Sequence, residues 1–137
     1  MTVTHVNAVF RHIEMKQLIL DIETNSSHNS IWIVVTQDVK TEEVICHTDP
    51  STLAPLVKEY DQIIGHNLIG FDAPVLRTVW NIGIPKSKAV DTLVLSRLLN
   101  PVIEGGHSLR AWGNRLGDQK IEFDFEDFDH GLTQEMQ

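Results

Sequence analysis

Two carboxylates, Asp21 and Glu23, close the apolar run in "KQLILDIETN", residues 16–25. Side chains alternate across a β-strand, so both acids point to one face of the strand and Ile22 points to the other. Neighbouring carboxylates repel each other and raise each other's pKa unless a cation lies between them. Hard divalent cations such as Mg²⁺ take oxygen ligands of this type. The pair therefore indicates a metal site, although a lone D-x-E more often marks an exposed strand end before a solvated turn.

Further acids lie in two stretches, "IIGHNLIGFDAPVL" at residues 63–76 and "AVDTLVLSRLLNP" at residues 89–101. Asn67 and Asp72 flank a short loop between a strand and a helix. Asp72 precedes Ala-Pro, which makes it a good helix N-cap, and Asn67 could simply close a turn. Asp91 is another N-cap candidate, and capping is its better interpretation. Taken separately, these residues favour a structural role.

The pattern of apolar and turn-forming residues predicts an α/β fold. Strands are expected at 16–23, 31–38, 42–48, 62–67 and 88–91, and helices at 49–60, 71–84, 92–101 and 108–117. Ser51 and Ser108 are the cap candidates, Gly83 and Pro85 end the second helix, and Gly117 ends the last. Three consecutive strands predict antiparallel hairpins, and strands separated by helices predict parallel additions. The result is a mixed five-stranded sheet flanked by helices.

Length and composition predict one globular domain: 137 residues, 42% hydrophobic and 22% charged. The single cysteine, Cys46, excludes an intrachain disulfide and a Cys-rich metal site, and it fits a reducing cytoplasmic compartment. No apolar run approaches the roughly 20 residues of a membrane span. The net charge is −8, most of it carried by residues 117–137. Nucleic-acid binding would therefore depend on metal ions held by carboxylates and not on a broad basic face.

Considered together, "DIET", "HNLIGFD" and "DTLVLSRLLNPVIEGGHSLRAWGNRLG" form a constellation in order and spacing. It resembles the DEDD (DnaQ-like) superfamily of 3′–5′ exonucleases, most of all the proofreading domain of bacteriophage family A DNA polymerases. The resemblance covers residues 16–137, which we interpret as an exonuclease-like domain after an N-terminal extension, residues 1–15. It implies a ribonuclease H-like fold. The activity it implies is hydrolysis of the terminal phosphodiester of single-stranded DNA.

The resemblance also implies roles for individual residues. Three acids match catalytic metal ligands, namely Asp21, Glu23 and Asp72. In a two-metal mechanism, Mg²⁺ or Mn²⁺ ions about 4 Å apart would hold the scissile phosphate, activate a water and stabilise the leaving 3′ oxygen. The residues matching the site for the terminal nucleotide are Thr24, through its backbone amide, His66, Asn67 and Phe71. Phe71 could equally belong to the core, and His66 could be a satisfied loop histidine. The implied partners are a single-stranded DNA 3′ end and a polymerase domain, in a host cytoplasm if the gene is from a phage.

The third motif of the superfamily, Tyr-x-x-x-Asp or His-x-x-x-x-Asp, has no good match. Tyr60 lies between the first two motifs, and His130 has an acid at the right spacing, but that acid is Glu135. We therefore expect the chain to end before this motif, with weak catalysis and with apolar surface that a second copy would cover in a homodimer. One alternative is an inactive exonuclease-fold module that binds nucleic acid or a partner protein. Another is an ordinary α/β domain whose acids are caps and turn residues.

Overall fold

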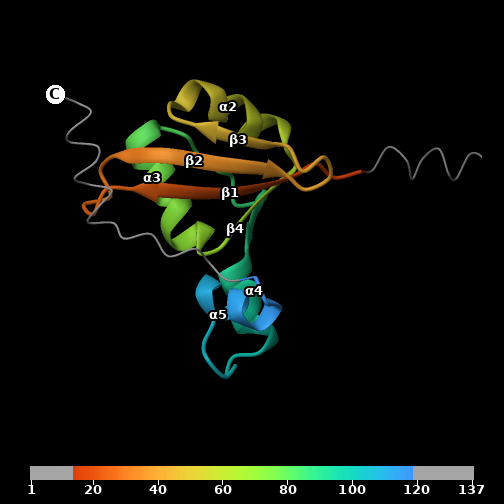
Figure 1. Cartoon of the computed structure of the whole chain (residues 1–137). Helices are drawn as coiled ribbons and strands as arrows, with labels where there is room; N and C mark the ends of the chain where they lie inside the picture. The colour runs from red at the N-terminus through yellow and green to blue at the C-terminus, as the bar shows by residue number, and fades with distance from the viewer. Residues whose placement is uncertain (1–13, 119–137) are drawn as a thin grey trace, which may run out of the picture. The chain divides into compact units, whose positions relative to one another are not determined.

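The computed structural model describes residues 14–118, which fall into two compact units with described parts 14–101 and 102–118. The first unit holds a five-stranded sheet, three α-helices and a π-helical turn (Figure 1). Its strands are β1 (Gln17–Thr24), β2 (Ile31–Asp38), β3 (Val44–His47), β4 (Gln62–Gly65) and β5 (Ala89–Asp91). Its helical elements are α2 (Pro50–Glu59), η1 (Leu68–Asp72), α3 (Ala73–Trp80) and α4 (Thr92–Leu99), and the second unit holds α5 (Leu109–Leu116).

The sheet has the order β3-β2-β1-β4-β5, with β1 in the centre. The hairpin-linked pairs β1–β2 and β2–β3 are antiparallel, whereas β1–β4 and β4–β5 are parallel. Parallel neighbours require a crossover, and α2 and α3 lie in the connections that supply it. The predicted element order and the mixed five-stranded sheet are both confirmed.

The hydrophobic core lies on one face of β1. Leu18, Leu20 and Ile22 are buried there, whereas Ile19 and Asp21 on the opposite face are exposed. This alternation is the one expected for a strand with a single covered face. Burial of each aliphatic side chain contributes about 1.5–3 kcal/mol. The helices add the buried side chains that complete the cluster, Leu53 and Val57 from α2 and Val75 and Leu76 from α3.

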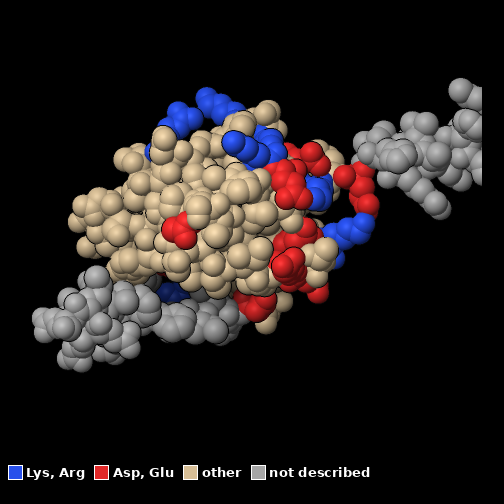
Figure 2. All heavy atoms as spheres, turned by 90° about the horizontal axis from the view of Figure 1, so that it is seen from above, with Lys and Arg blue, Asp and Glu red and all other residues tan. Residues whose placement is uncertain are grey.

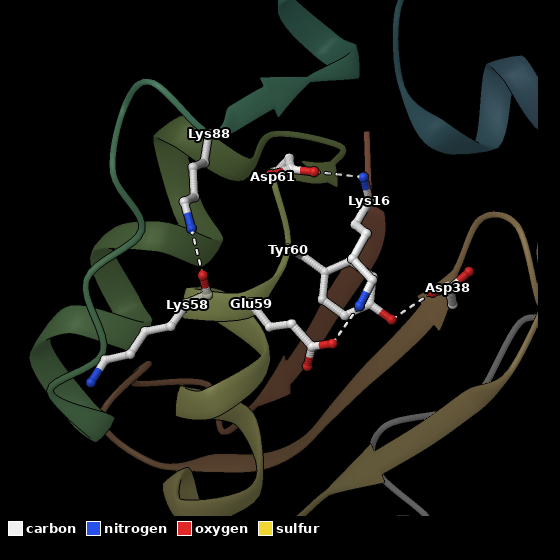
Figure 3. A network of polar contacts seen from close by, with 7 residues as sticks. All are labelled: Lys16, Asp38, Lys58, Glu59, Tyr60, Asp61 and Lys88. Atoms are coloured by element: carbon white, nitrogen blue, oxygen red, sulfur yellow. Dashed lines mark hydrogen bonds and ion pairs between the residues drawn. The ribbon is translucent and has the colours of Figure 1, made fainter. Parts of the chain in front are cut away.

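Helix α2 is capped at both ends by side chains. Its N-cap is Asp49, whose carboxylate accepts a hydrogen bond from the Ser51 backbone N–H at 2.8 Å, so the prediction of Ser51 as the cap was wrong. An aspartate one residue before Pro50 serves better because proline suits the first helical position. At the other end, the Lys88 ammonium donates to the carbonyls of Val57 and Lys58 at 3.0 Å (Figure 3).

Helix α3 is shorter than predicted at both ends. It begins at Ala73 because Leu68–Asp72 already form the π-helical turn, and it ends at Asn81, which adopts the left-handed conformation (φ 54°). Asparagine tolerates this conformation better than most residues, so the helix stops before Gly83. The predicted stops at Gly83 and Pro85 were therefore too late.

The start of β1 is held by a polar network (Figure 3). The Lys16 ammonium pairs with Glu59, and the Lys16 backbone N–H donates to Asp61 at 2.7 Å. The Tyr60 hydroxyl donates to Asp38 Oδ2 at 2.5 Å, and this bond is the main reason that the Tyr60 pKa rises to about 12. The network fixes the N-terminal end of β1 and leaves its C-terminal end, with Asp21 and Glu23, free of these contacts.

The second unit has its own capping contacts. Ser108 caps α5 through a hydrogen bond from the Ala111 N–H at 3.0 Å, and Gly117 ends it at φ 73°, as predicted. The Arg115 guanidinium lies 4.8 Å from the centre of the Trp112 ring. These contacts explain the turn and helix pattern in this part of the sequence.

Charged side chains are unevenly distributed on the face seen from above. They gather toward the right-hand end of that view, with further basic side chains along one edge (Figure 2). Most of the remaining surface on this face carries no charge, so this side of the described part presents no broad basic patch. Between residues 14 and 118, no helix combines the length and apolar character needed to cross a membrane.

Candidate active site

The site forms where β1 extends beyond its parallel neighbour. β4 pairs with β1 only from Gln17 to Ile19 and ends at Gly65. Gly65 passes so close to β1 that a Cβ atom at this position would lie 3.1 Å from the Leu20 carbonyl oxygen. After this point the chain turns away and returns at Asp72, whose carboxyl pKa is influenced by the Ile22 backbone N–H and by the charge of Asp21. Asp72 thus reaches the strand segment between Asp21 and Glu23.

Asp72 is a buried acid held against other acids. Its side chain is 3% exposed, and its pKa is raised to about 7, first by burial and then by the charge of Asp21, with a further contribution from Asp91. Hydrogen bonds from its own N–H and from Ile22 lower the pKa only in part. Asp72 has helical φ and ψ and makes no capping bond to α3, so the capping interpretation was wrong. A buried acid with this perturbation is typical of a functional site.

The Asp21–Asp72 pair fits a hard divalent cation. A cation between the two carboxylates would offset both the repulsion and the burial that raise the Asp72 pKa. Glu23 is half-buried and shares a strand face with Asp21. Across residues 14–118, however, the structure contains no group of three or more His, Cys, Asp or Glu side chains that could hold a metal ion. In this part of the chain the charge of Asp21 acts on Asp72, and the three predicted ligands stay a prediction.

Three of the four residues expected to bind a nucleotide, His66, Asn67 and Phe71, lie on the segment from His66 to Asp72. His66 Nδ1 lies 2.9 Å from the Thr92 hydroxyl, whereas its Nε2 is buried and has no hydrogen-bond partner among residues 14–118. The interpretation of His66 as a satisfied loop histidine therefore holds for one ring nitrogen only. Asn67 is left-handed (φ 59°) and starts the π-helical turn. The segment that leads to Asp72 therefore carries a histidine ring with one nitrogen that lacks a partner among the described residues.

Phe71 meets the turn that follows β1. Its ring is half-buried against the core, and it makes an edge-on contact with His28 at 5.0 Å between ring centres. His28 Nδ1 lies 2.9 Å from the Thr24 hydroxyl. Thr24, His28 and Phe71 therefore form a chain of contacts from the end of β1 to the segment carrying Asp72. Sequence reasoning missed His28, because a histidine in a polar turn carries no motif.

Comparisons with known proteins show similarity to phage DNA polymerases. No protein-family model matches the chain. The DNA-directed DNA polymerase of Enterobacteria phage T3 is 30% identical over 58% of this chain, and that of Escherichia phage T7 is 26% identical over 86% of it. The matched regions are 14% and 21% of those polymerases, so the chain spans about a fifth of their length or less.

Solved structures show the same fold at low sequence identity. The family B DNA polymerase of the hyperthermophilic archaeon Pyrobaculum calidifontis matches 78% of this chain and 19% of its own, with a TM-score of 0.60 and 18% identity. The EXD2 exonuclease domain matches 96% of this chain and 76% of its own, with a TM-score of 0.50 and 14% identity. Together, these similarities support a DnaQ-like 3′–5′ exonuclease domain. Its mixed sheet is the ribonuclease H-like sheet that the sequence predicted.

Asp91 makes more contacts than its sequence context predicted. It caps α4 as expected, with its Oδ1 accepting from the Leu93 N–H at 2.9 Å. The same carboxylate accepts from the N–H groups of Asn67 and Ile69, also at 2.9 Å. These partners lie 24 and 22 residues away, so no local pattern could reveal them.

The candidates for the third exonuclease motif gain no support. Tyr60 belongs to the network at the start of β1, bonded to Asp38, whereas Asp21 and Glu23 are at the other end of the strand. His130 and Glu135 lie outside the described residues. The candidate site residues in the described part are therefore the three predicted acids, Asp21, Glu23 and Asp72.

Proposed function

We propose that this chain is a 3′–5′ exonuclease domain that hydrolyses the terminal phosphodiester of single-stranded DNA, using Mg²⁺ or Mn²⁺. The observation that carries the proposal is the buried Asp72, with its pKa near 7, held against Asp21 at the end of β1. The superfamily relationship supports the reaction class. The related EXD2 exonuclease domain was crystallised and soaked in Mg and GMP, which supports a divalent cation here.

Asp21, Glu23 and Asp72 would hold the metal ions in this proposal. When bound, such ions polarise the phosphate and lower the pKa of a bound water. The chain's own contribution is to keep Asp72 dry and aimed at β1 through the Ile22 N–H. The Asp72 proton would leave as a cation enters, because the cation favours the charged carboxylate.

The terminal nucleotide would be bound by Thr24, His66, Asn67 and Phe71. The Phe71 ring is half-buried and contacts His28, so it offers an aromatic surface next to Asp72 in the sequence. Stacking of a base on an aromatic ring is sequence-tolerant, as removal of any terminal nucleotide requires. The buried Nε2 of His66 is a hydrogen-bonding group without a partner in the described structure.

We further propose that residues 16–137 form one exonuclease-like domain after an N-terminal extension, residues 1–15. It would act with a polymerase domain in a phage-infected host cytoplasm. We expect weak activity from this chain alone, because the described residues hold no group of three metal-binding side chains. The same observation favours the alternative of an inactive module that binds nucleic acid or a partner protein. The homodimer stays a prediction, supported by two exposed apolar side chains on one face of the sheet, Ile19 and Val44. Light scattering would test it.

A nuclease assay decides between the two. The chain is incubated with 5′-labelled single-stranded DNA in Mn²⁺, Mg²⁺ or EDTA, and products are resolved on a denaturing gel. We expect a slow ladder of 3′-shortened products that requires metal and disappears in Asp21→Ala. Asp49→Asn is the control because Asp49 caps α2 away from these acids. Metal-independent binding of the DNA with no shortening in any lane would reject the exonuclease and favour the inactive module.

A further inference from the structure

The Asp91 carboxylate joins two segments that are distant in the sequence. Its Oδ1 accepts from the N–H groups of Asn67 and Leu93, and its Oδ2 accepts from the Ile69 N–H, each at 2.9 Å. Asp91 is only 5% exposed. A buried carboxylate is stable when several hydrogen-bond donors satisfy its oxygens, and these three backbone groups do so. The residue therefore links the start of α4 to the segment that precedes Asp72.

The segment from His66 to Asp72 needs such support. Its first N–H groups have no partner inside the π-helical turn, as at the start of any helix. Asp91 accepts two of them, at Asn67 and Ile69. Inside the segment, the Phe71 N–H donates to the Asn67 carbonyl at 2.9 Å. Leu68 is completely buried and anchors the turn in the core.

The conformation of this segment is further restricted by its own side chains. Asn67 is left-handed, and its Oδ1 lies 2.5 Å from the point that a Cβ atom on Gly70 would occupy. Glycine is therefore required at position 70 for the Asn67 side chain to fold over the turn. These contacts restrict the backbone conformation of the segment between β4 and α3. Asp91 adds hydrogen bonds to it from a distant part of the sequence.

We propose that Asp91 is a positioning residue that holds the 66–72 segment, and with it Asp72, in the geometry that binds the catalytic metal. The proposal rests on the proposed exonuclease function. Asp91 would act through backbone groups and would not itself touch the metal or the DNA. Metal-site residues that act through other ligands commonly change metal affinity when they are replaced.

The test uses two variants that separate capping, charge and geometry. Asp91→Ser keeps a good N-cap for the Leu93 N–H, but its single short hydroxyl cannot also serve Asn67 and Ile69. Asp91→Asn keeps the side-chain shape, retains the two bonds at Oδ1 and places an NH₂ group against the Ile69 N–H. Asp49→Asn is the matched control, a change at the N-cap of α2. Asp72→Asn reports loss of the metal ligand itself.

Two readouts are measured on the full chain: Mn²⁺ affinity from the electron paramagnetic resonance signal of free Mn²⁺, and hydrogen exchange of the Ile69 amide by NMR. We expect Asp91→Ser to weaken Mn²⁺ binding about tenfold and to speed exchange of the Ile69 amide by about tenfold, the cost of one hydrogen bond to a charged group. The control should leave both unchanged. Circular dichroism verifies that α4 and the sheet are retained.

Parental Mn²⁺ affinity in Asp91→Ser, together with loss of binding in Asp72→Asn, would overturn the positioning role and leave the exonuclease proposal intact. No Mn²⁺ binding by the parent chain would overturn the exonuclease proposal, and the positioning role with it. If Asp91→Ser does not fold, Asp91→Asn decides. Weaker Mn²⁺ binding and faster Ile69 exchange in that variant support the role, and parental values of both reject it.

Discussion

Replacing Asp72 with asparagine is expected to stabilise the metal-free chain at pH 8 while removing a metal ligand. In the parent chain, the Asp72 carboxyl is buried and faces Asp21, which raises its pKa from 3.8 to about 7. At pH 8 the folded chain must therefore carry a buried charge that the unfolded chain exposes to water. Asparagine has nearly the same shape and carries no charge, so it removes this cost.

The sign of the pH dependence follows from the raised pKa. Between about pH 4 and pH 7, the folded chain binds a proton at Asp72 that the unfolded chain has released. The contribution of Asp72 to the parent's stability is therefore greatest below pH 4, falls as the pH rises toward 7, and then levels off. A pKa change from 3.8 to about 7 corresponds to about 4 kcal/mol as an upper limit.

The measurable gain is smaller than this limit. The Asp72 carboxylate accepts hydrogen bonds from its own N–H and from the Ile22 N–H, and an amide oxygen accepts them less strongly. Allowing for these bonds, we expect Asp72→Asn to raise the free energy of unfolding by about 1–3 kcal/mol at pH 8. At pH 5 the parent carboxyl is mostly protonated, so the two chains should differ little.

The assay is urea unfolding in EDTA at pH 5 and pH 8, followed by circular dichroism, with Asp49→Asn as a control for exposed capping carboxylates. Addition of Mg²⁺ at pH 8 should stabilise the parent and not Asp72→Asn, because only a ligand that binds the folded state shifts the equilibrium. The reasoning is refuted if Asp72→Asn is less stable than the parent at pH 8. It is also refuted if the difference in stability between the two chains is the same at both pH values.

Three further predictions concern the surrounding fold. Gly70→Ala should lower the free energy of unfolding, measured with urea, by about 1–3 kcal/mol, because the added Cβ would lie 2.5 Å from Asn67 Oδ1. Adding Asn67→Gly should restore most of this loss. His47 is buried between the hydroxyls of Thr36 and Thr52, and burial lowers its pKa below 6.5. The parent's stability should therefore fall as the pH drops below about 6.5, and His47→Gln should weaken that fall; equal slopes for both would contradict this. Asn81→Gly should raise the midpoint of thermal unfolding, because glycine adopts the left-handed conformation at the C-cap of α3 at a lower cost than asparagine, a gain of up to about 1 kcal/mol. An unchanged or lower midpoint would count against this prediction.

Much of the fold could be predicted because its determinants are local. Alternation along β1 placed Asp21 opposite Ile22, and the burial of Leu20 and Ile22 confirms it. The short connections between the first three strands predicted antiparallel pairing. The end of α3 was misplaced because asparagine and glycine both end helices, and the nearer Asn81 adopted the left-handed conformation first.

The sequence named candidate site residues but could not predict the conformation around Asp72. "FDAP" has the composition of an N-cap, yet Asp72 enters α3 from a π-helical turn with its backbone already helical. A residue in that conformation cannot aim its side chain back at the N–H groups of its own helix. Its carboxylate is then available to the Ile22 N–H on β1. The irregular turn is thus what changes a capping residue into a candidate ligand.

The same reasoning explains why two aspartates in similar contexts have different roles. Asp91 has extended φ and ψ and caps α4, and its carboxylate is satisfied by three backbone N–H groups. Asp72 is as deeply buried, but it faces Asp21 and has a raised pKa. A satisfied carboxylate stabilises the surrounding backbone, whereas an acid held against a like charge destabilises the fold until a cation or a proton compensates it. The contrast in bonding between Asp72 and Asp91, and not the sequence pattern they share, is the reason that we propose metal binding for the first and positioning for the second.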